Sequence, residues 1–262
     1  MGHLPLHPDP VLSAQPSTQP AGQRGVGVVV PYDFALDREL WRWTPAEVSL
    51  HLTRTPFEPL EVGVAQALAI GDRDVVRRGT RDLTVVEPEV VAYACTSGSF
   101  ASGRDGERAL SRAMRDAGAP AAVTTSGALS AAVAALGIHA VAVATPYDEP
   151  VAALLRSYLA ESGVEVTRNE NLRMHHRIWT VPGTETVELV RRTASTGSEA
   201  VFVSCTNLPT YDLIVGLEAE LGMPVITANQ VTMWAALGTL GLAAVGPGQR
   251  LLEVAYPSGP ES

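Results

Sequence analysis

The chain has 262 residues, 46% of them hydrophobic, and a formal net charge of −9. That length can bury one large core or two half-size lobes, and the negative charge argues against a general nucleic-acid-binding protein. Charged residues or prolines interrupt every apolar stretch before it reaches the roughly 18 residues of a membrane span, so we expect no membrane partner.

The first 24 residues are rich in proline, glutamine and serine and lack the apolar segment of a secretory signal. This composition predicts a disordered tail at 1–24. The chain has only two cysteines, so without a signal we expect a cytoplasmic protein whose thiols stay reduced, with no structural disulfide.

Beyond the tail, short apolar runs alternate with segments of helical periodicity. The predicted strands are residues 25–31, 48–56, 90–95, 121–125, 139–146, 164–170, 200–205 and 224–229. The predicted helical segments are residues 59–77, 104–120, 126–137, 149–163, 185–195, 213–222 and 230–241. This alternation indicates mainly parallel sheets with right-handed crossovers.

The rhythm occurs twice, which predicts an α/β protein of two similar Rossmann-like lobes with the active site in the cleft between them. The expected division is a first lobe at 25–120, completed by 230–262, and a second lobe at 121–229. Ligands of such sheets lie at the carboxyl ends of the strands.

The two cysteines share one local frame, VVAYACTSGSF around Cys95 and AVFVSCTNLPT around Cys205, 110 positions apart. In each, an apolar strand ends at Cys-Thr and gives way to a polar turn before a helix. The start of a helix offers free N–H donors and a positive dipole end, both of which favour a thiolate. Two thiols facing one pocket could form an acid/base pair.

These motifs resemble the aspartate/glutamate racemase superfamily, in the branch of maleate cis-trans isomerase, arylmalonate decarboxylase and the related ectoine-utilisation protein. The resemblance covers about residues 25–252. Its landmarks are VVVP (28–31), ACTSGSF (94–100), ATPYDEPV (144–151), SCTNLPT (204–210), GMPVITANQ (222–230) and PGQRLLE (247–253).

The resemblance implies chemistry without a cofactor at a carbon next to a carboxylate, on a small carboxylate or dicarboxylate substrate. Racemases of the superfamily use one cysteine as base and the other as acid, whereas in maleate isomerase-like members a cysteine adds to the alkene. Decarboxylase members keep only the second cysteine. Having both Cys95 and Cys205, this chain fits an isomerase or racemase better, and its relatives imply a homo-oligomer.

An enediolate needs fixed hydrogen-bond donors around its oxygens. Those expected beside the thiols are Thr96, Ser97, Thr206 and Asn207, which could equally be helix caps. Tyr147 of the TPY segment resembles the family tyrosine that binds a substrate carboxylate.

The sequence departs from the family after the first strand. Maleate isomerase-like proteins carry a carboxylate-binding asparagine there, and Phe34 stands at about that position, which argues against maleate itself as substrate. Another such asparagine corresponds to Asn169 or Asn171. Tyr32, Asp33 and Phe34 belong to a segment that is either a packed surface or a wall that shapes the substrate pocket.

Two alternatives remain open. The first is an arylmalonate decarboxylase-like enzyme with Cys205 as proton donor, and the second is a non-catalytic carboxylate-binding protein. We expect no metal site, because no ligand set at suitable spacing accompanies His175 and His176. A nucleotide site is equally unexpected, because TSGSFASGRDG lacks the glycine spacing and lysine of a phosphate loop.

Overall fold

The computed structural model describes residues 23–257 and contains two four-stranded parallel sheets. The first sheet, ordered β2-β1-β3-β4, has the strands β1 (Arg24–Val30), β2 (Val48–Arg54), β3 (Val90–Tyr93) and β4 (Ala122–Thr124). The second, ordered β6-β5-β7-β8, has the strands β5 (Ala140–Thr145), β6 (Glu165–Asn171), β7 (Ala200–Val203) and β8 (Val225–Thr227). The two sheets therefore repeat one topology, and the predicted two-lobed α/β fold is confirmed.

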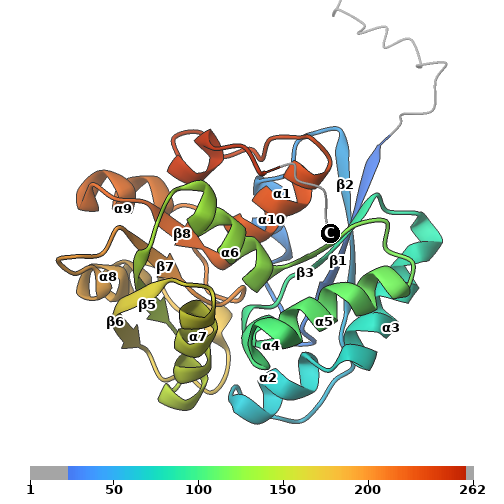
Figure 1. Ribbon diagram of the computed structural model, residues 1–262, viewed down its shortest axis with the longest axis horizontal. Coiled ribbons are helices and arrows are strands. Elements are labelled where there is room, and N and C mark those ends of the chain that lie inside the picture. Colours follow the sequence, from blue (N-terminus) through green and yellow to red (C-terminus); the bar gives the residue numbers. More distant parts are fainter. Residues whose placement is uncertain (1–22, 258–262) are drawn as a thin grey trace, which may run out of the picture.

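Helices flank both sheets, and α6 (Thr125–Ala135) and α10 (Ala228–Thr239) lie between the two sheets (Figure 1). In the first half they are α1 (Asp37–Arg42), α2 (Val64–Ile70), α3 (Arg73–Leu83), η1 (Thr84–Val86), α4 (Thr96–Phe100), α5 (Gly103–Asp116) and α6 (Thr125–Ala135). In the second they are α7 (Glu149–Glu161), η2 (Ile178–Thr180), α8 (Gly183–Thr193), α9 (Ile214–Leu221), α10 (Ala228–Thr239) and η3 (Arg250–Glu253). Within the described residues, no helix is long and apolar enough to cross a membrane.

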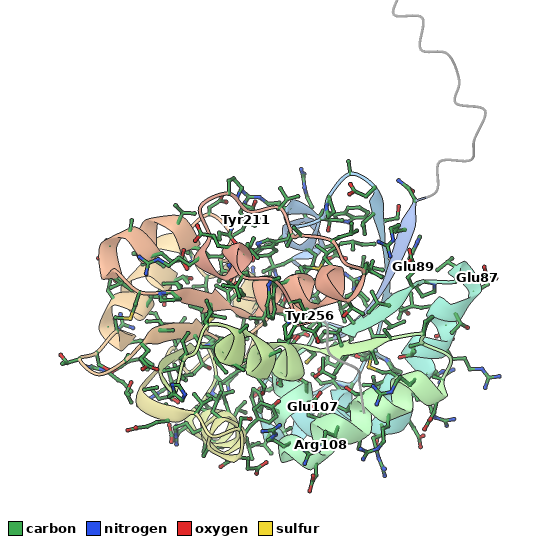
Figure 2. All side chains as sticks on the ribbon, turned by 45° about the horizontal axis from the view of Figure 1, so that its top comes forward. Glu87, Glu89, Glu107, Arg108, Tyr211 and Tyr256 are labelled. Atoms are coloured by element: carbon green, nitrogen blue, oxygen red, sulfur yellow. The ribbon has the colours of Figure 1, made fainter. Side chains whose placement is uncertain are left out.

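The lobes meet through α6 and α10, each of which follows the last strand of its sheet. Both helices are rich in small residues that allow close approach. The hydroxyls of Thr125 and Thr232 lie 2.8 Å apart across this contact. Charged side chains such as Glu87 and Arg108 point outward from the lobes (Figure 2), so the apolar face of each element is free to build the core.

One strand lies in a different sheet from the one that the predicted division of the lobes implies. β4 pairs with β3 in the first sheet, whereas the sequence division placed residues 121–125 in the second lobe. The apolar pattern of this strand shows that it is buried but does not identify its sheet. The C-terminal segment returns to the first lobe, where the N–H of Val245 donates to the carbonyl of Trp43 at 2.8 Å. The division into folding units stays a prediction.

Three local differences from the predicted elements are visible. The predicted helical segment 59–77 is broken at Gly71, where the lack of a side chain lets the backbone approach Gly98, since a Cβ there would lie 2.3 Å from the Gly98 carbonyl oxygen, and Asp72 caps the next helix. The strands before the two cysteines end at Tyr93 and Val203, two residues earlier than predicted. Most of the predicted tail at 1–24 lies outside the described residues, and its last residue begins β1.

Candidate active site between the two lobes

The two cysteines occupy equivalent places in the two sheets. Cys95 follows the end of β3 by two residues and Cys205 follows the end of β7 by two, and both strands are third in the chain order of their sheets. Both thiols line one cavity between the lobes. The cavity is lined by Pro31, Asp33, Val62, Gln66, Ile70, Cys95, Thr96, Ser97, Tyr147, Ile178, Cys205, Thr206 and Asn207.

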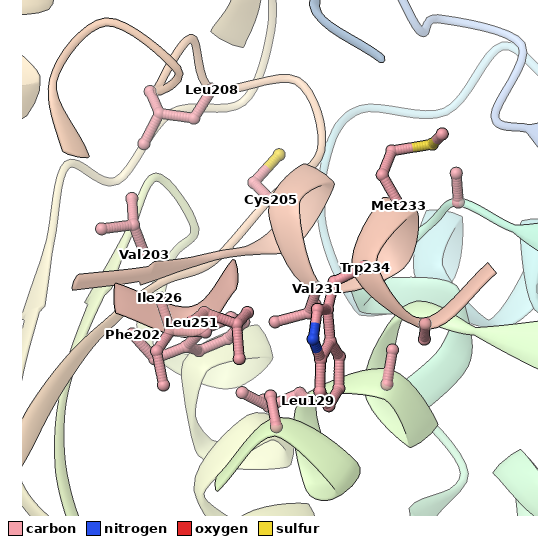
Figure 3. Packing of buried hydrophobic residues seen from close by; sticks show 14 of the residues in the cluster. Leu129, Phe202, Val203, Cys205, Leu208, Ile226, Val231, Met233, Trp234 and Leu251 are labelled. Carbon is pink, nitrogen blue, oxygen red and sulfur yellow. The ribbon is translucent and has the colours of Figure 1, made fainter. Parts of the chain in front are cut away.

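The cavity is small and its two thiols are buried. Its volume of about 20 Å³ is enough for about one water molecule, and Cys95 and Cys205 are only 2% and 7% exposed. Figure 3 shows Cys205 among buried apolar side chains that include Leu208 and Met233. A carboxylic acid substrate does not fit this volume, so its binding requires the lining residues to move apart.

The first cysteine is held at the start of α4. The Cys95 Sγ accepts a hydrogen bond from the backbone N–H of Gly98 at 3.3 Å, and the Ser97 hydroxyl lies 3.9 Å away. A Cβ on Gly98 would lie 2.1 Å from the hydroxyl oxygen of Tyr93. That hydroxyl donates to the carbonyl of Ile70 at 2.7 Å, so the glycine lets α4, β3 and α2 converge on the thiol.

The second cysteine has an unusual backbone conformation. Cys205 has a φ of 89°, which lies in a region that residues other than Gly, Asn and Asp rarely adopt. The other described non-glycine residues with positive φ, Glu87, Arg173 and Arg177, are not buried. The backbone N–H of Asn207 donates to the Cys205 Sγ at 3.4 Å. Strain of this kind clusters at functional sites, which makes the position a candidate for function on backbone geometry alone.

Burial keeps both thiols protonated near neutral pH. It raises the pKa of Cys95 to about 11, although the hydrogen bond from Gly98 opposes this shift. Burial likewise raises the pKa of Cys205 to about 12, opposed by the hydroxyl of Tyr147 and the N–H of Asn207. The charge of Asp33 raises both values further.

These pKa values predict slow alkylation that accelerates with pH. Thiolate is the reactive form, and the folded protein forms it only as pH rises toward about 11. We expect iodoacetamide to modify the folded protein at pH 7.5 at least about a hundredfold more slowly than glutathione, with the rate rising about tenfold per pH unit up to pH 10. The unfolded chain should react as fast as glutathione. A rate that is flat between pH 7 and 9 would show that one thiol is already ionised.

Asn207 uses its whole side chain to join the two lobes. Its Oδ1 accepts from the N–H of Ala35 at 2.9 Å, and its Nδ2 donates to the carbonyl of Asp33 at 3.0 Å. Both partners lie in the loop after β1. The amide therefore fixes that loop against the second cysteine loop, while the backbone N–H of the same residue contacts the Cys205 thiol.

A half-buried carboxylate holds the rest of the second cysteine loop in place. Glu39 of α1 accepts from the N–H of Thr210 at 3.2 Å and from its hydroxyl at 2.9 Å. Asn229 of α10 donates to Glu39 at 3.4 Å and to the carbonyl of Thr206 at 2.9 Å. Burial raises the pKa of Glu39. Residues of α1 and α10 thus hold the loop that carries the second thiol.

The predicted donors beside the thiols come together. Thr96, Ser97, Tyr147 and Thr206 line the cavity with both cysteines. The Thr96 hydroxyl oxygen is buried without a hydrogen-bond partner, which leaves it able to bind a ligand. Burial raises the pKa of Tyr147 well above its usual range, so its hydroxyl stays a hydrogen-bond donor.

Two predicted substrate-binding residues do not reach the cavity. Phe34 is 3% exposed and packs in the main core, because a turn bonded from its N–H to the carbonyl of Pro31 directs it inward. Asn169 lies on the edge strand β6, where its Oδ1 accepts from Arg156 at 3.0 Å and its Nδ2 donates to Asn171. Its amide is therefore engaged in a polar cluster apart from the thiols.

The cavity also contains Asp33, from the segment that the sequence assigns either to a packed surface or to a pocket wall, and five residues that are not predicted from the sequence as site residues: Pro31, Val62, Gln66, Ile70 and Ile178. A signal for Asp33 is present in the sequence, because Pro-Tyr-Asp follows the first strand of each sheet, at 31–33 and at 146–148. No comparable signal marks the apolar members. Among residues 23–257, no three His, Cys, Asp or Glu side chains gather as a metal site.

Comparison with known proteins gives relatives in two enzyme groups. The chain is 31% identical to a maleate isomerase from Pseudomonas putida over 227 residues, covering 81% of this chain and 87% of the relative. It is 29% identical to an arylmalonate decarboxylase from Bordetella bronchiseptica over 230 residues, covering 85% and 93%.

The fold agrees with these relatives. A cysteine-to-serine mutant of the Nocardia farcinica maleate cis-trans isomerase, solved with a covalently bound succinylcysteine intermediate, superposes with a TM-score of 0.78 at 26% identity, covering 87% of this chain and 98% of the other. The family model described as arylmalonate decarboxylase matches residues 67–252. The chain therefore belongs to the arylmalonate decarboxylase and maleate isomerase branch of the aspartate/glutamate racemase superfamily.

Proposed function

We propose that this protein is a cofactor-independent isomerase or racemase that moves a proton at the α-carbon of a small carboxylate, with Cys95 and Cys205 as the acid/base pair. The observation that carries the proposal is that both thiols line one small cavity between the lobes. Thiols that approach from different lobes can serve opposite faces of a planar intermediate.

The proposed step balances within the cavity. The step starts from the form in which one cysteine has first lost its proton to solvent, against the pKa of about 11 or 12 that burial gives the two thiols. That thiolate takes the α-proton, and the electron pair of the C–H bond moves into the carboxylate to form an enediolate. The thiol of the other cysteine then gives its proton to the opposite face. The negative charge passes from one sulfur to the other, so neither metal nor cofactor is needed and the enzyme alternates between two protonation states.

Hydroxyl groups supply the stabilisation that an enediolate needs. We assign carboxylate binding to Thr96, Ser97, Tyr147 and Thr206, which line the cavity. Asn207 is assigned a positioning role instead, because both ends of its amide are bonded to the loop after β1. The burial of both thiols also keeps water away from them, which strengthens these hydrogen bonds.

A deuterium-exchange experiment tests the proposal. The protein is incubated in deuterium oxide with α-substituted carboxylates, arylmalonates and maleate, and the products are followed by NMR and chiral chromatography. Deuterium at the α-carbon together with loss of optical purity is the expected result. Conversion of maleate to fumarate would instead support the addition of a cysteine to the alkene, as the succinylcysteine in the Nocardia relative suggests for that protein.

Decarboxylation of a disubstituted malonate is the second candidate. The observation in its favour is the protonated state of the Cys205 thiol, whose pKa burial raises to about 12, because a neutral thiol can protonate the carbanion left by carbon dioxide. In that reaction Cys95 is dispensable. Carbon dioxide release that survives Cys95→Ala but not Cys205→Ala would favour this candidate, whereas ligand binding without any turnover would favour a binding protein.

A further inference from the structure

The repeated Pro-Tyr-Asp tripeptide is used differently in the two lobes. It follows β1 as residues 31–33 and β5 as residues 146–148. In the second lobe the tyrosine lines the cavity, and Asp148 caps α7 by accepting from the N–H of Val151 at 3.2 Å. In the first lobe it is the aspartate, Asp33, that lines the cavity.

Local contacts explain this exchange. The hydroxyl of Tyr32 donates to the carbonyl of Leu60 at 3.1 Å and accepts from Gln66 at 3.0 Å, which holds the ring outside the cavity. Asp33 does not cap a helix, because α1 begins four residues later, after Leu36. Its side chain lines the cavity instead and forms a hydrogen bond with the amide of Gln66.

The charges of the cavity are unbalanced. The described lining residues include one carboxyl group, that of Asp33, but no arginine, lysine or histidine. A substrate carboxylate can bind to the four hydroxyls already described. A second substrate carboxylate would lie beside the half-buried Asp33 or a thiol without a counter-charge, and like charges that are partly removed from water repel.

We propose that Asp33 determines the substrate class: it excludes dicarboxylates and selects monocarboxylates whose second polar group donates a hydrogen bond, such as an α-hydroxyl or an α-ammonium. This rests on the proposed function in one respect, that the cavity binds a carboxylate. Asp33 accepts the hydrogen bond from the donor group, while Thr96, Ser97, Tyr147 and Thr206 hold the carboxylate.

A matched ligand series tests the proposal. Methylmalonate, lactate and alanine share one core, as do phenylmalonate, mandelate and phenylglycine, and within each set only the second polar group changes. Affinity is measured by ligand-observed NMR, which needs no turnover. We expect the better of the hydroxy and amino acids of each set to bind at least about tenfold more tightly than the matching malonate.

Asp33→Asn is the decisive variant, because it keeps the shape of the side chain and the backbone carbonyl to which Asn207 donates. It should tighten binding of the malonates by at least about tenfold and weaken binding of the amino acids. Asp37→Asn is the control, since it removes the same charge four residues away, where Asp37 pairs with Arg54 at 3.0 Å outside the cavity. The control should keep the wild-type order of affinities.

The outcomes separate this proposal from the proposed function. Equal affinity for malonates and their partners, or no difference between Asp33→Asn and Asp37→Asn, overturns the role of Asp33 even if deuterium exchange occurs. The expected order of affinities without exchange on any ligand supports the role of Asp33 and overturns the proposed proton transfer. Absence of binding across both sets overturns both.

Discussion

Cys95→Ala and Cys205→Ala are each expected to abolish racemisation in both directions, with a loss of about 10²- to 10⁴-fold in rate. The reason is that the proposed reaction needs a base on one face and an acid on the other, and each variant removes one of them. The remaining thiol can still exchange the α-proton of a single enantiomer. Chiral chromatography and deuterium incorporation, measured on both enantiomers, distinguish these effects.

Ser204→Ala is the matched control for this experiment. Ser204 is fully buried and adjoins Cys205, and its hydroxyl has no hydrogen-bond partner in the described structure, but it does not line the cavity. It should keep the wild-type rate. If either cysteine variant racemises its substrate at the control rate, the two-cysteine mechanism is wrong.

Asn207→Ala is expected to lower the free energy of unfolding by about 1–3 kcal/mol. The substitution removes the Asn207 amide, so the N–H of Ala35 and the carbonyl of Asp33, both in the loop after β1, lose their hydrogen bonds. Both groups are only partly buried, so each lost hydrogen bond costs about 0.5–1.5 kcal/mol. Urea denaturation followed by circular dichroism measures the loss, and the wild-type slope with denaturant would show that the folded state keeps its compactness.

Asn171→Ala supplies the comparison for that measurement. Asn171 donates its amide to the exposed Glu149 at 3.2 Å on the outer strand β6, so its loss should cost less than about 1 kcal/mol. If Asn207→Ala is no more destabilising than Asn171→Ala, the link between the loops does not hold the lobes together.

Most of the fold could be predicted because it depends on local periodicity. Buried parallel strands are continuous apolar runs, and the alternation with helices determines the class of sheet. The sheet to which β4 belongs could not be predicted, since pairing with β3 is a contact between strands and leaves no mark on a three-residue apolar strand.

The candidate site could be predicted where it depends on repetition and not where it depends on packing. The matched loops of Cys95 and Cys205 can be recognised in the sequence, whereas Val62 and Ile178 reach the cavity only in the folded chain. Phe34 packs in the core and not in the predicted pocket, because the place of a residue after a strand does not determine the direction of its side chain. Asn207 was expected to bind substrate, but its amide is bonded to a loop more than 170 residues earlier in the chain.

The left-handed backbone conformation of Cys205 lowers the stability of the fold at the residue to which we assign chemistry. At a φ of 89° glycine would fit without strain, while every side chain except those of Asn and Asp costs on the order of 1 kcal/mol or more. Selection for a robust fold alone would therefore drive this position toward glycine. If the thiol has the proposed role, replacing Cys205 by glycine should stabilise the fold while removing the activity.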